Sequence, residues 1–152
     1  MSAATISKIV RELKDRPGAL LPILHGIQEE LGYIPEDAVP IIAGEMNLTR
    51  AEVHGVVTFY HDFRSHPPGR HIVRICQAES CQAAGSAALT DHVRKRLGIQ
   101  FHQTTSDRAC SLEPVYCLGN CALSPSVMVN QEVFGRVTAE RFDEILEEAR
   151  RP

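Results

Sequence analysis

The stretches HIVRICQAESC (residues 71–81) and LEPVYCLGNCALSP (residues 112–125) share one pattern: an apolar run leads directly into two closely spaced cysteines. The first pair, Cys76 and Cys81, has the spacing C-x4-C, and the second, Cys117 and Cys121, has C-x3-C. Short apolar or β-branched runs predict strands. Each pair is therefore expected at a strand end, where loops present side chains from a rigid scaffold. Four thiolates from two such loops are a ligand set for an iron–sulfur cluster or a metal ion.

The sequence around these two stretches predicts a small α/β domain. Leu89, Val93 and Leu97 fall on one face of a helix over residues 86–97, and Gly98 ends it. Thr138 is placed to cap a final helix. Strands are expected at residues 71–75, 99–104, 112–116, 127–129 and 133–137, the last two joined as a hairpin. Strands alternating with helices in this order favour a mixed sheet.

The residues before His71 predict helices instead. Apolar stripes indicate helices over residues 1–14 and 20–31, and Pro35 is placed to open a third, shorter helix. A fourth follows the capping box formed by Thr49 and Glu52. The prolines and glycine of residues 65–69 break this pattern. We expect a helical docking segment at residues 1–66, because its apolar faces exceed what so short a region buries, and an α/β domain at residues 70–152.

The composition of the chain argues against several classes of function. The chain has 152 residues and a net charge of −3. It lacks the basic stripe that nucleic-acid binding requires. Its apolar stretches are interrupted well before the ~18 residues of a membrane span, so no membrane insertion is expected. The charged N-terminus lacks a secretory hydrophobic region, which predicts a cytoplasmic location, where cysteine pairs more often bind metal than form disulfides.

Several kinds of site compete for the cysteines. A structural zinc ion also takes four thiolates, although its cysteine pairs are usually spaced C-x2-C. A further alternative to the iron–sulfur cluster is that these are ordinary buried cysteines. Neither pair has the C-x-x-C spacing of a thiol–disulfide oxidoreductase. Cys110 belongs to no close pair and is expected to be a non-ligand thiol. No phosphate-binding loop, dinucleotide motif or nucleophile motif is present, so we expect no catalytic residue and no bound nucleotide or flavin.

Several motifs beyond the cysteines carry a family resemblance. They are PGALLPIL (residues 17–24), ELGYIP (residues 30–35), AEVHGVVTFY (residues 51–60), the first cysteine pair and residues 112–125. With them the chain resembles the thioredoxin-like 2Fe-2S ferredoxin subunits that accompany flavoproteins in NADH-linked redox enzymes. The similarity spans residues 17 to about 137. Within the family it looks most like the γ subunit of NAD-dependent formate dehydrogenase. The corresponding subunits of respiratory complex I and of NAD-linked hydrogenase come next.

The resemblance implies a fold, a cofactor and partners. It implies a thioredoxin-like domain over residues 70–152, preceded by the helical segment. It implies one 2Fe-2S cluster per chain, held by Cys76, Cys81, Cys117 and Cys121. The partner would be a subunit that binds FMN and NAD and, through it, a large molybdenum or tungsten formate dehydrogenase subunit. The chain would relay electrons and have no dehydrogenase activity alone. The competing hypothesis is a zinc-stapled assembly module without a redox role.

Overall fold

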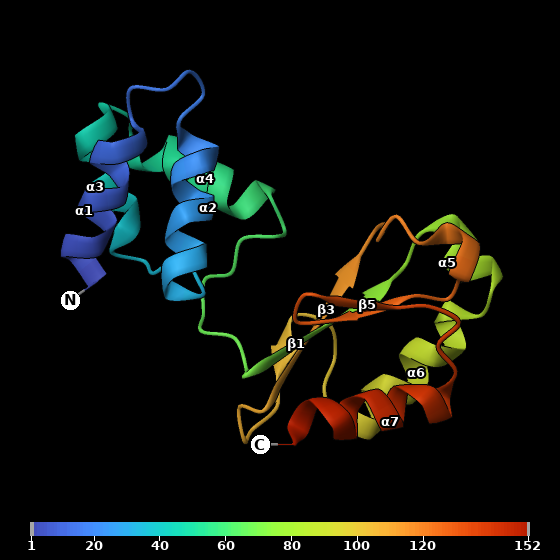
Figure 1. The fold of residues 1–152 in the computed structure, drawn as a ribbon. Helices are drawn as coiled ribbons and strands as arrows, with labels where there is room; N and C mark the ends of the chain where they lie inside the picture. Colours follow the sequence, from blue (N-terminus) through green and yellow to red (C-terminus); the bar gives the residue numbers. More distant parts are fainter. Residues whose placement is uncertain (1, 152) are drawn as a thin grey trace. The chain divides into compact units, whose positions relative to one another are not determined.

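The computed structural model describes residues 2–151, and the chain divides into two compact units between Pro67 and Pro68. Each unit has its own buried apolar core. Figure 1 shows the helical first unit in blue to green and the second unit, built on a sheet, in green to red.

The first unit is made of four helices whose apolar stripes meet. They are α1 (Ser2–Leu13), α2 (Leu20–Leu31), α3 (Ala38–Met46) and α4 (Arg50–Phe59). Ile6 and Val10 of α1 and Ile23, Leu24 and Ile27 of α2 are fully buried. Their spacing of three and four residues places them on one face of each helix, as the sequence predicted. The predicted start of the first helix at Met1 lies outside the described residues.

Two helix starts show how local chemistry sets the boundaries. At α4 the predicted capping box is confirmed, because Thr49 Oγ accepts the Glu52 N–H at 3.2 Å and Glu52 Oε2 accepts the Thr49 N–H at 2.8 Å. The third helix begins at Ala38 and not at Pro35. Pro40 therefore lies in its first turn, where an N–H has no partner within the helix and proline is tolerated.

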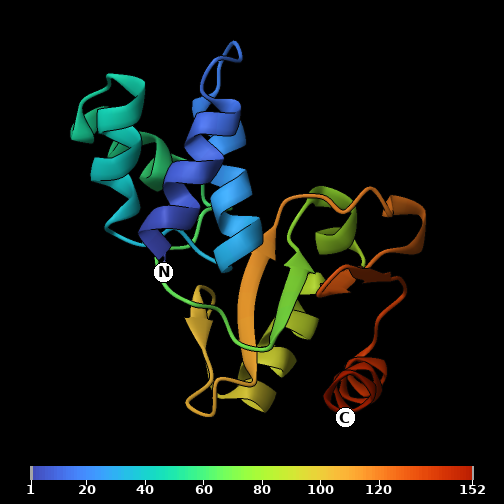
Figure 2. The ribbon, with the colours of Figure 1, turned by 60° about the vertical axis from the view of Figure 1, so that its left-hand side comes forward.

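The second unit is a five-stranded mixed sheet with helices, which confirms the predicted α/β class. Its strands are β1 (His71–Cys76), β2 (Gln103–Thr104), β3 (Cys110–Val115), β4 (Val127–Val129) and β5 (Glu132–Phe134). Their order across the sheet is β2-β3-β1-β4-β5, and only β1 and β3 pair in parallel. Figure 2 shows β1 and β3 side by side.

The structure of this unit differs from the prediction in three places. The last strand, expected over residues 133–137, ends at Phe134. The strand expected over residues 99–104 is reduced to Gln103–Thr104, because His102 has a left-handed backbone (φ 63°) that a strand cannot continue through. A short helix, α5 (Glu79–Ala83), was not predicted, since five residues are too few to show a helical period.

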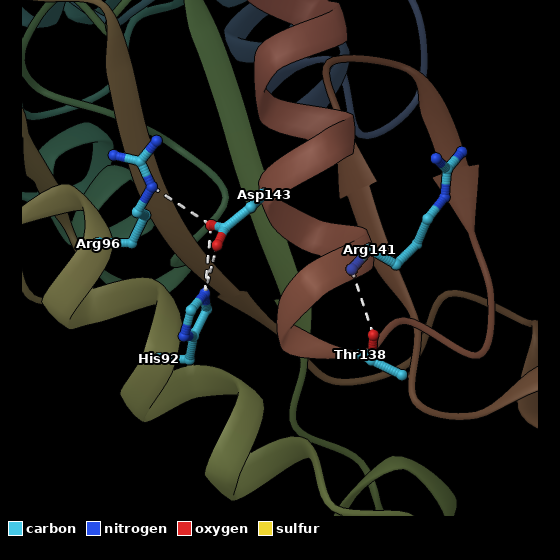
Figure 3. Close-up of polar contacts among 5 residues, drawn as sticks. All are labelled: His92, Arg96, Thr138, Arg141 and Asp143. Atoms are coloured by element: carbon cyan, nitrogen blue, oxygen red, sulfur yellow. Dashed lines mark hydrogen bonds and ion pairs between the residues drawn. The ribbon is translucent and has the colours of Figure 1, made fainter.

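Helices α6 (Ser86–Leu97) and α7 (Ala139–Arg150) supply the apolar side chains that pack on the sheet. Phe142 of α7 is fully buried. The two helices are also linked at the surface, where Asp143 contacts His92 Nε2 at 3.2 Å and Arg96 Nε at 3.3 Å (Figure 3). Thr138 caps α7 as predicted, accepting the Arg141 N–H at 3.2 Å.

Among residues 2–151, no helix combines the length and the apolar character needed to cross a lipid bilayer.

Candidate functional site

The parallel pairing of β1 and β3 brings the two cysteine loops together. Cys76 is the last residue of β1 and lies opposite Val115, the last residue of β3. Since parallel strands end at the same edge of a sheet, the chain after each strand enters the same region. Cys81 follows in α5, and Cys117 and Cys121 follow β3 in a loop that ends in a short 3-10 turn (Cys121–Leu123).

The four cysteines differ in exposure by pair. Cys76 and Cys81 are each 2% exposed, whereas Cys117 and Cys121 lie at the surface. The sulfurs of the exposed pair are 4.0 Å apart. The site is therefore a buried pair of thiols with an exposed pair beside it.

Hydrogen bonds tie the two loops to each other. Ser124 Oγ lies 3.4 Å from Cys81 Sγ and 2.8 Å from Ser80 Oγ. The hydroxyl of this residue, from the second loop, therefore contacts two residues of the first loop. Ser80 Oγ donates to the Cys121 carbonyl at 3.2 Å. The backbone adds a bond from the Cys76 N–H to the Ser126 carbonyl at 3.1 Å. These contacts fix the spacing of the loops at the strand ends.

Glycines at two positions allow the exposed loop to adopt its shape. Gly119 has φ 72°, a left-handed conformation that favours glycine, and its N–H donates to Cys117 Sγ at 3.3 Å. Gly135, at the end of β5, packs against the loop so closely that a Cβ there would stand 2.5 Å from Leu123 Cβ and 2.8 Å from Asn120 Nδ2. The left-handed turn at Gly119 thus brings a backbone N–H to the sulfur of Cys117.

The pKa values of Cys76, Cys81 and Cys121 are shifted in different directions. Burial raises the pKa of Cys76, and the hydrogen bond and charge of Cys81 raise it further. Burial acts the same way on Cys81, but hydrogen bonds from Ser124, Cys76 and Ser126 outweigh it and lower its pKa. The pKa of Cys121 is raised by its hydrogen bond with Cys117 and then by the nearby Cys117 charge. Of these three thiols, Cys81 is the one whose surroundings favour the thiolate.

The four thiols of the two cysteine pairs lie near the edge of the sheet where β1 and β3 end. Within residues 2–151, no three His, Cys, Asp or Glu side chains form a group able to hold a metal ion. The thiols lie as two pairs, and the charge of Cys81 contributes to the raised pKa of Cys121. A 2Fe-2S cluster distributes four thiolates over two irons. Cys117 and Cys121 are exposed, so their sulfurs are accessible from solvent.

Cys110 stands apart from this site. It is the first residue of β3, at the opposite end of the strand from Cys117, and it is fully buried in the core of the second unit. Arg150 Nη2 lies 3.5 Å from its sulfur.

The sequence did not point to the hydroxyl groups at the site. Ser80 and Ser124 are separated by 44 residues and meet only because β1 and β3 end together. Each lies within three residues of a cysteine, and serines that close to a predicted ligand were the one available signal.

Comparison with known proteins identifies relatives of the whole chain. A family model described as Thioredoxin-like [2Fe-2S] ferredoxin matches residues 6–150. A subunit of the NADH-quinone oxidoreductase of Pseudomonas aeruginosa is 33% identical over 144 residues, covering 95% of this chain and 87% of that protein. The HndA subunit of the NADP-reducing hydrogenase of Solidesulfovibrio fructosivorans is 32% identical over 143 residues, covering 94% of this chain and 84% of that protein.

A solved structure is also similar. It is the crystal structure of an NAD+-reducing [NiFe]-hydrogenase in the air-oxidised state, with a TM-score of 0.73 and 27% identity. The match covers 91% of this chain and 24% of the hydrogenase chain. The names of these three relatives agree with the complex I and hydrogenase alternatives better than with the formate dehydrogenase subunit that the sequence first suggested.

Proposed function

The chain belongs to the thioredoxin-like [2Fe-2S] ferredoxin family, and we propose that it is the electron-transfer subunit of an NAD-linked oxidoreductase complex, holding its cluster with Cys76, Cys81, Cys117 and Cys121. The 2Fe-2S cluster is the cofactor of this family and of this chain. When bound, such a cluster accepts and returns one electron at a time.

One observation carries the ligand assignment. The parallel strands β1 and β3 end together, and the two cysteine pairs leave from that shared edge. Cys110 lies at the other end of β3, which supports leaving it out of the ligand set. The loops also offer the N–H of Gly119 and the hydroxyl of Ser124 to the sulfurs, which is what a negatively charged site requires when it gains an electron.

A flavoprotein is the partner that this chemistry needs. Oxidation of NADH releases two electrons as a hydride, whereas the site proposed here takes one, so a flavin must convert between the two. No dinucleotide or phosphate-binding motif occurs in the chain, so the flavin and the NAD site would lie in another subunit. Four thiols that must stay reduced until loading favour a cytoplasmic location.

Exposed apolar side chains support docking on such a partner. Tyr116, which precedes Cys117, is 75% exposed, and Leu123, two residues after Cys121, is 41% exposed. In the helical unit Phe59, at the end of α4, is 73% exposed. Large apolar side chains left at the surface indicate a protein interface.

For the parent complex we favour an NADH-quinone oxidoreductase or an NAD-linked hydrogenase. The support is the similarity to named subunits of both kinds over more than nine-tenths of this chain. Identifying the large subunit that copurifies with the native chain decides between these complexes and a formate dehydrogenase.

Single cysteine replacements test the ligand set. Alanine at position 76, 81, 117 or 121 should reduce bound iron and abolish the visible charge-transfer absorption, because each removes one of four ligands. Cys110→Ala is the matched control and should retain both. A colourless wild-type chain that binds zinc would show the assembly-module alternative to be correct. An iron-free Cys110→Ala beside an iron-replete Cys76→Ala would refute the ligand assignment.

The carrier role is tested by separating the two electron steps. The isolated chain should be reduced by dithionite, seen as bleaching of its absorption and an EPR signal, but it should not oxidise NADH. Adding the flavoprotein subunit should make NADH an effective reductant. Steady NADH oxidation by the flavin-free chain would contradict the proposal.

A further inference from the structure

We propose that the hydroxyl group of Ser124 donates a hydrogen bond to the ligand sulfur of Cys81 in the cluster-bound protein, and that this bond makes the cluster easier to reduce. The inference rests on the proposed function, since it takes Cys81 as a ligand. Ser124, which lies outside both cysteine pairs, would then contribute to the reduction potential of the cluster.

The geometry places one hydroxyl among three acceptors. Ser124 Oγ is 3.4 Å from Cys81 Sγ, 2.9 Å from the Cys121 carbonyl oxygen and 2.8 Å from Ser80 Oγ. A serine has a single hydrogen to donate, so it serves one of these acceptors at a time. Which one it serves depends on what else can bond to the Cys121 carbonyl.

Ser80 supplies a second hydroxyl donor for the Cys121 carbonyl. Its own hydroxyl reaches the same Cys121 carbonyl at 3.2 Å. Two hydroxyl hydrogens are therefore available for two acceptors, the carbonyl of Cys121 and the sulfur of Cys81. With Ser80 donating to the carbonyl, Ser124 is free to donate to the sulfur. A thiolate sulfur is the stronger acceptor because it carries charge, and this selects that arrangement once Cys81 is a ligand.

The surroundings make this bond effective. Cys81 is 2% exposed, and Ser124 is partly buried, so water competes weakly for the sulfur. Bonds to a charged group are stronger in such a setting than at an open surface.

The sign of the effect follows from charge. Reduction adds one negative charge to the site, and part of it falls on the ligand sulfurs. A donor to a sulfur therefore stabilises the reduced form more than the oxidised form, and its removal makes the reduction potential more negative. We expect Ser124→Ala to lower the equilibrium constant for reduction about threefold to tenfold, a shift of about 28 to 59 mV for a one-electron couple.

The test is an EPR-monitored redox titration of the cluster-loaded full-length chain and its variants. Ser124→Ala should shift the potential in the negative direction, whereas Ser124→Thr keeps the hydroxyl and should titrate close to the wild type. Ser106→Ala, a change at an exposed turn before β3, is the matched control and should not shift. Iron content and visible absorption confirm equal loading of each variant.

A fourth variant tests how the two hydroxyl hydrogens are shared between the acceptors. Ser80→Ala leaves Ser124 as the only hydroxyl for both acceptors, so its shift should be negative but smaller. If Ser124→Ala fails to hold a cluster, the Ser80→Ala titration decides alone. A potential unchanged in Ser124→Ala, or shifted equally in Ser124→Thr, would overturn the inference. A wild-type chain without a cluster would instead refute the proposed function, so the two failures are distinguishable.

Discussion

The thiols of Cys117 and Cys121 are exposed, and their sulfurs are 4.0 Å apart. Without a cluster, an oxidant in solution reaches them more readily than the buried thiols of Cys76 and Cys81. A disulfide needs its sulfurs about 2 Å apart, and both of these cysteines are exposed to an oxidant. We expect a low-molecular-weight disulfide such as oxidised glutathione to join these two cysteines first in the cluster-free chain. Their two thiol hydrogens pass to the glutathione, giving two reduced molecules of it.

Mass spectrometry measures this reaction as a loss of two hydrogens on a peptide containing both residues. The oxidised chain should then resist cluster loading until a reductant is added. A Cys117→Ser variant provides the control, since it has no partner for Cys121. Oxidation of Cys76 and Cys81 ahead of the exposed pair would contradict the expectation.

Among the elements, the end of strand β5 has a direct effect on the cysteine loop. A Cβ at Gly135 would overlap Leu123 and Asn120, so Gly135→Ala should displace the loop and lower cluster retention several-fold. Gly44→Ala is the matched control. Gly44 lies inside α3 with open space where a Cβ would stand, and alanine there should stabilise the helix by about 0.5–1 kcal/mol. The measurements are iron content and urea unfolding, and equal iron in both variants would refute the role of Gly135.

The capping box of α4 predicts a pH dependence. Hydrogen bonds from the backbone N–H and then the hydroxyl of Thr49 hold the pKa of Glu52 below its usual value of 4.5. Because the folded pKa is the lower one, the stabilisation is complete above pH 4.5 and is lost as the pH falls through the folded value. Glu52→Gln should therefore lower the urea midpoint of the helical unit at pH 7 but not well below pH 4.5. Glu36→Gln serves as the control, and a difference that persists unchanged at low pH would contradict this account.

Most elements were predictable from the sequence because their signals are local. The stripe Leu20–Leu31, the Thr49 cap and the strand before Cys76 each depend on neighbouring residues only. The pairing of the two cysteine loops was also expected, since both follow strands. The position of Ser124 beside Cys81 was not, because it depends on β1 and β3 pairing in parallel register. Nor was the short β2, which is limited by the backbone conformation of His102.

At the level of the whole molecule, the chain has two separate cores. Residues of the first core lie between Ile6 and Phe63, and those of the second lie between Val73 and Leu146. The last part of the first unit is tied to α2, where Gln28 bonds to the backbone of Asp62 and Arg64 at 2.8 Å. The start of the second unit is tied to β3, where the Gly69 N–H donates to Ser111 Oγ at 2.7 Å. The hydrogen bonds at the end of the first unit and at the start of the second therefore lie within their own units.

A chain of residues 68–152 should therefore fold and hold its cluster without the helical unit. All four proposed ligands and the hydroxyls beside them lie within it. It should show the visible absorption of the full chain, yet bind the flavoprotein subunit much more weakly, because the exposed aromatic end of α4 would be missing. Absorption spectra and pull-down of the flavoprotein measure the two properties. A Phe59→Ala full-length chain is the control for docking alone, with normal colour and reduced binding. Undiminished binding by residues 68–152 would assign docking to the cysteine-bearing unit instead.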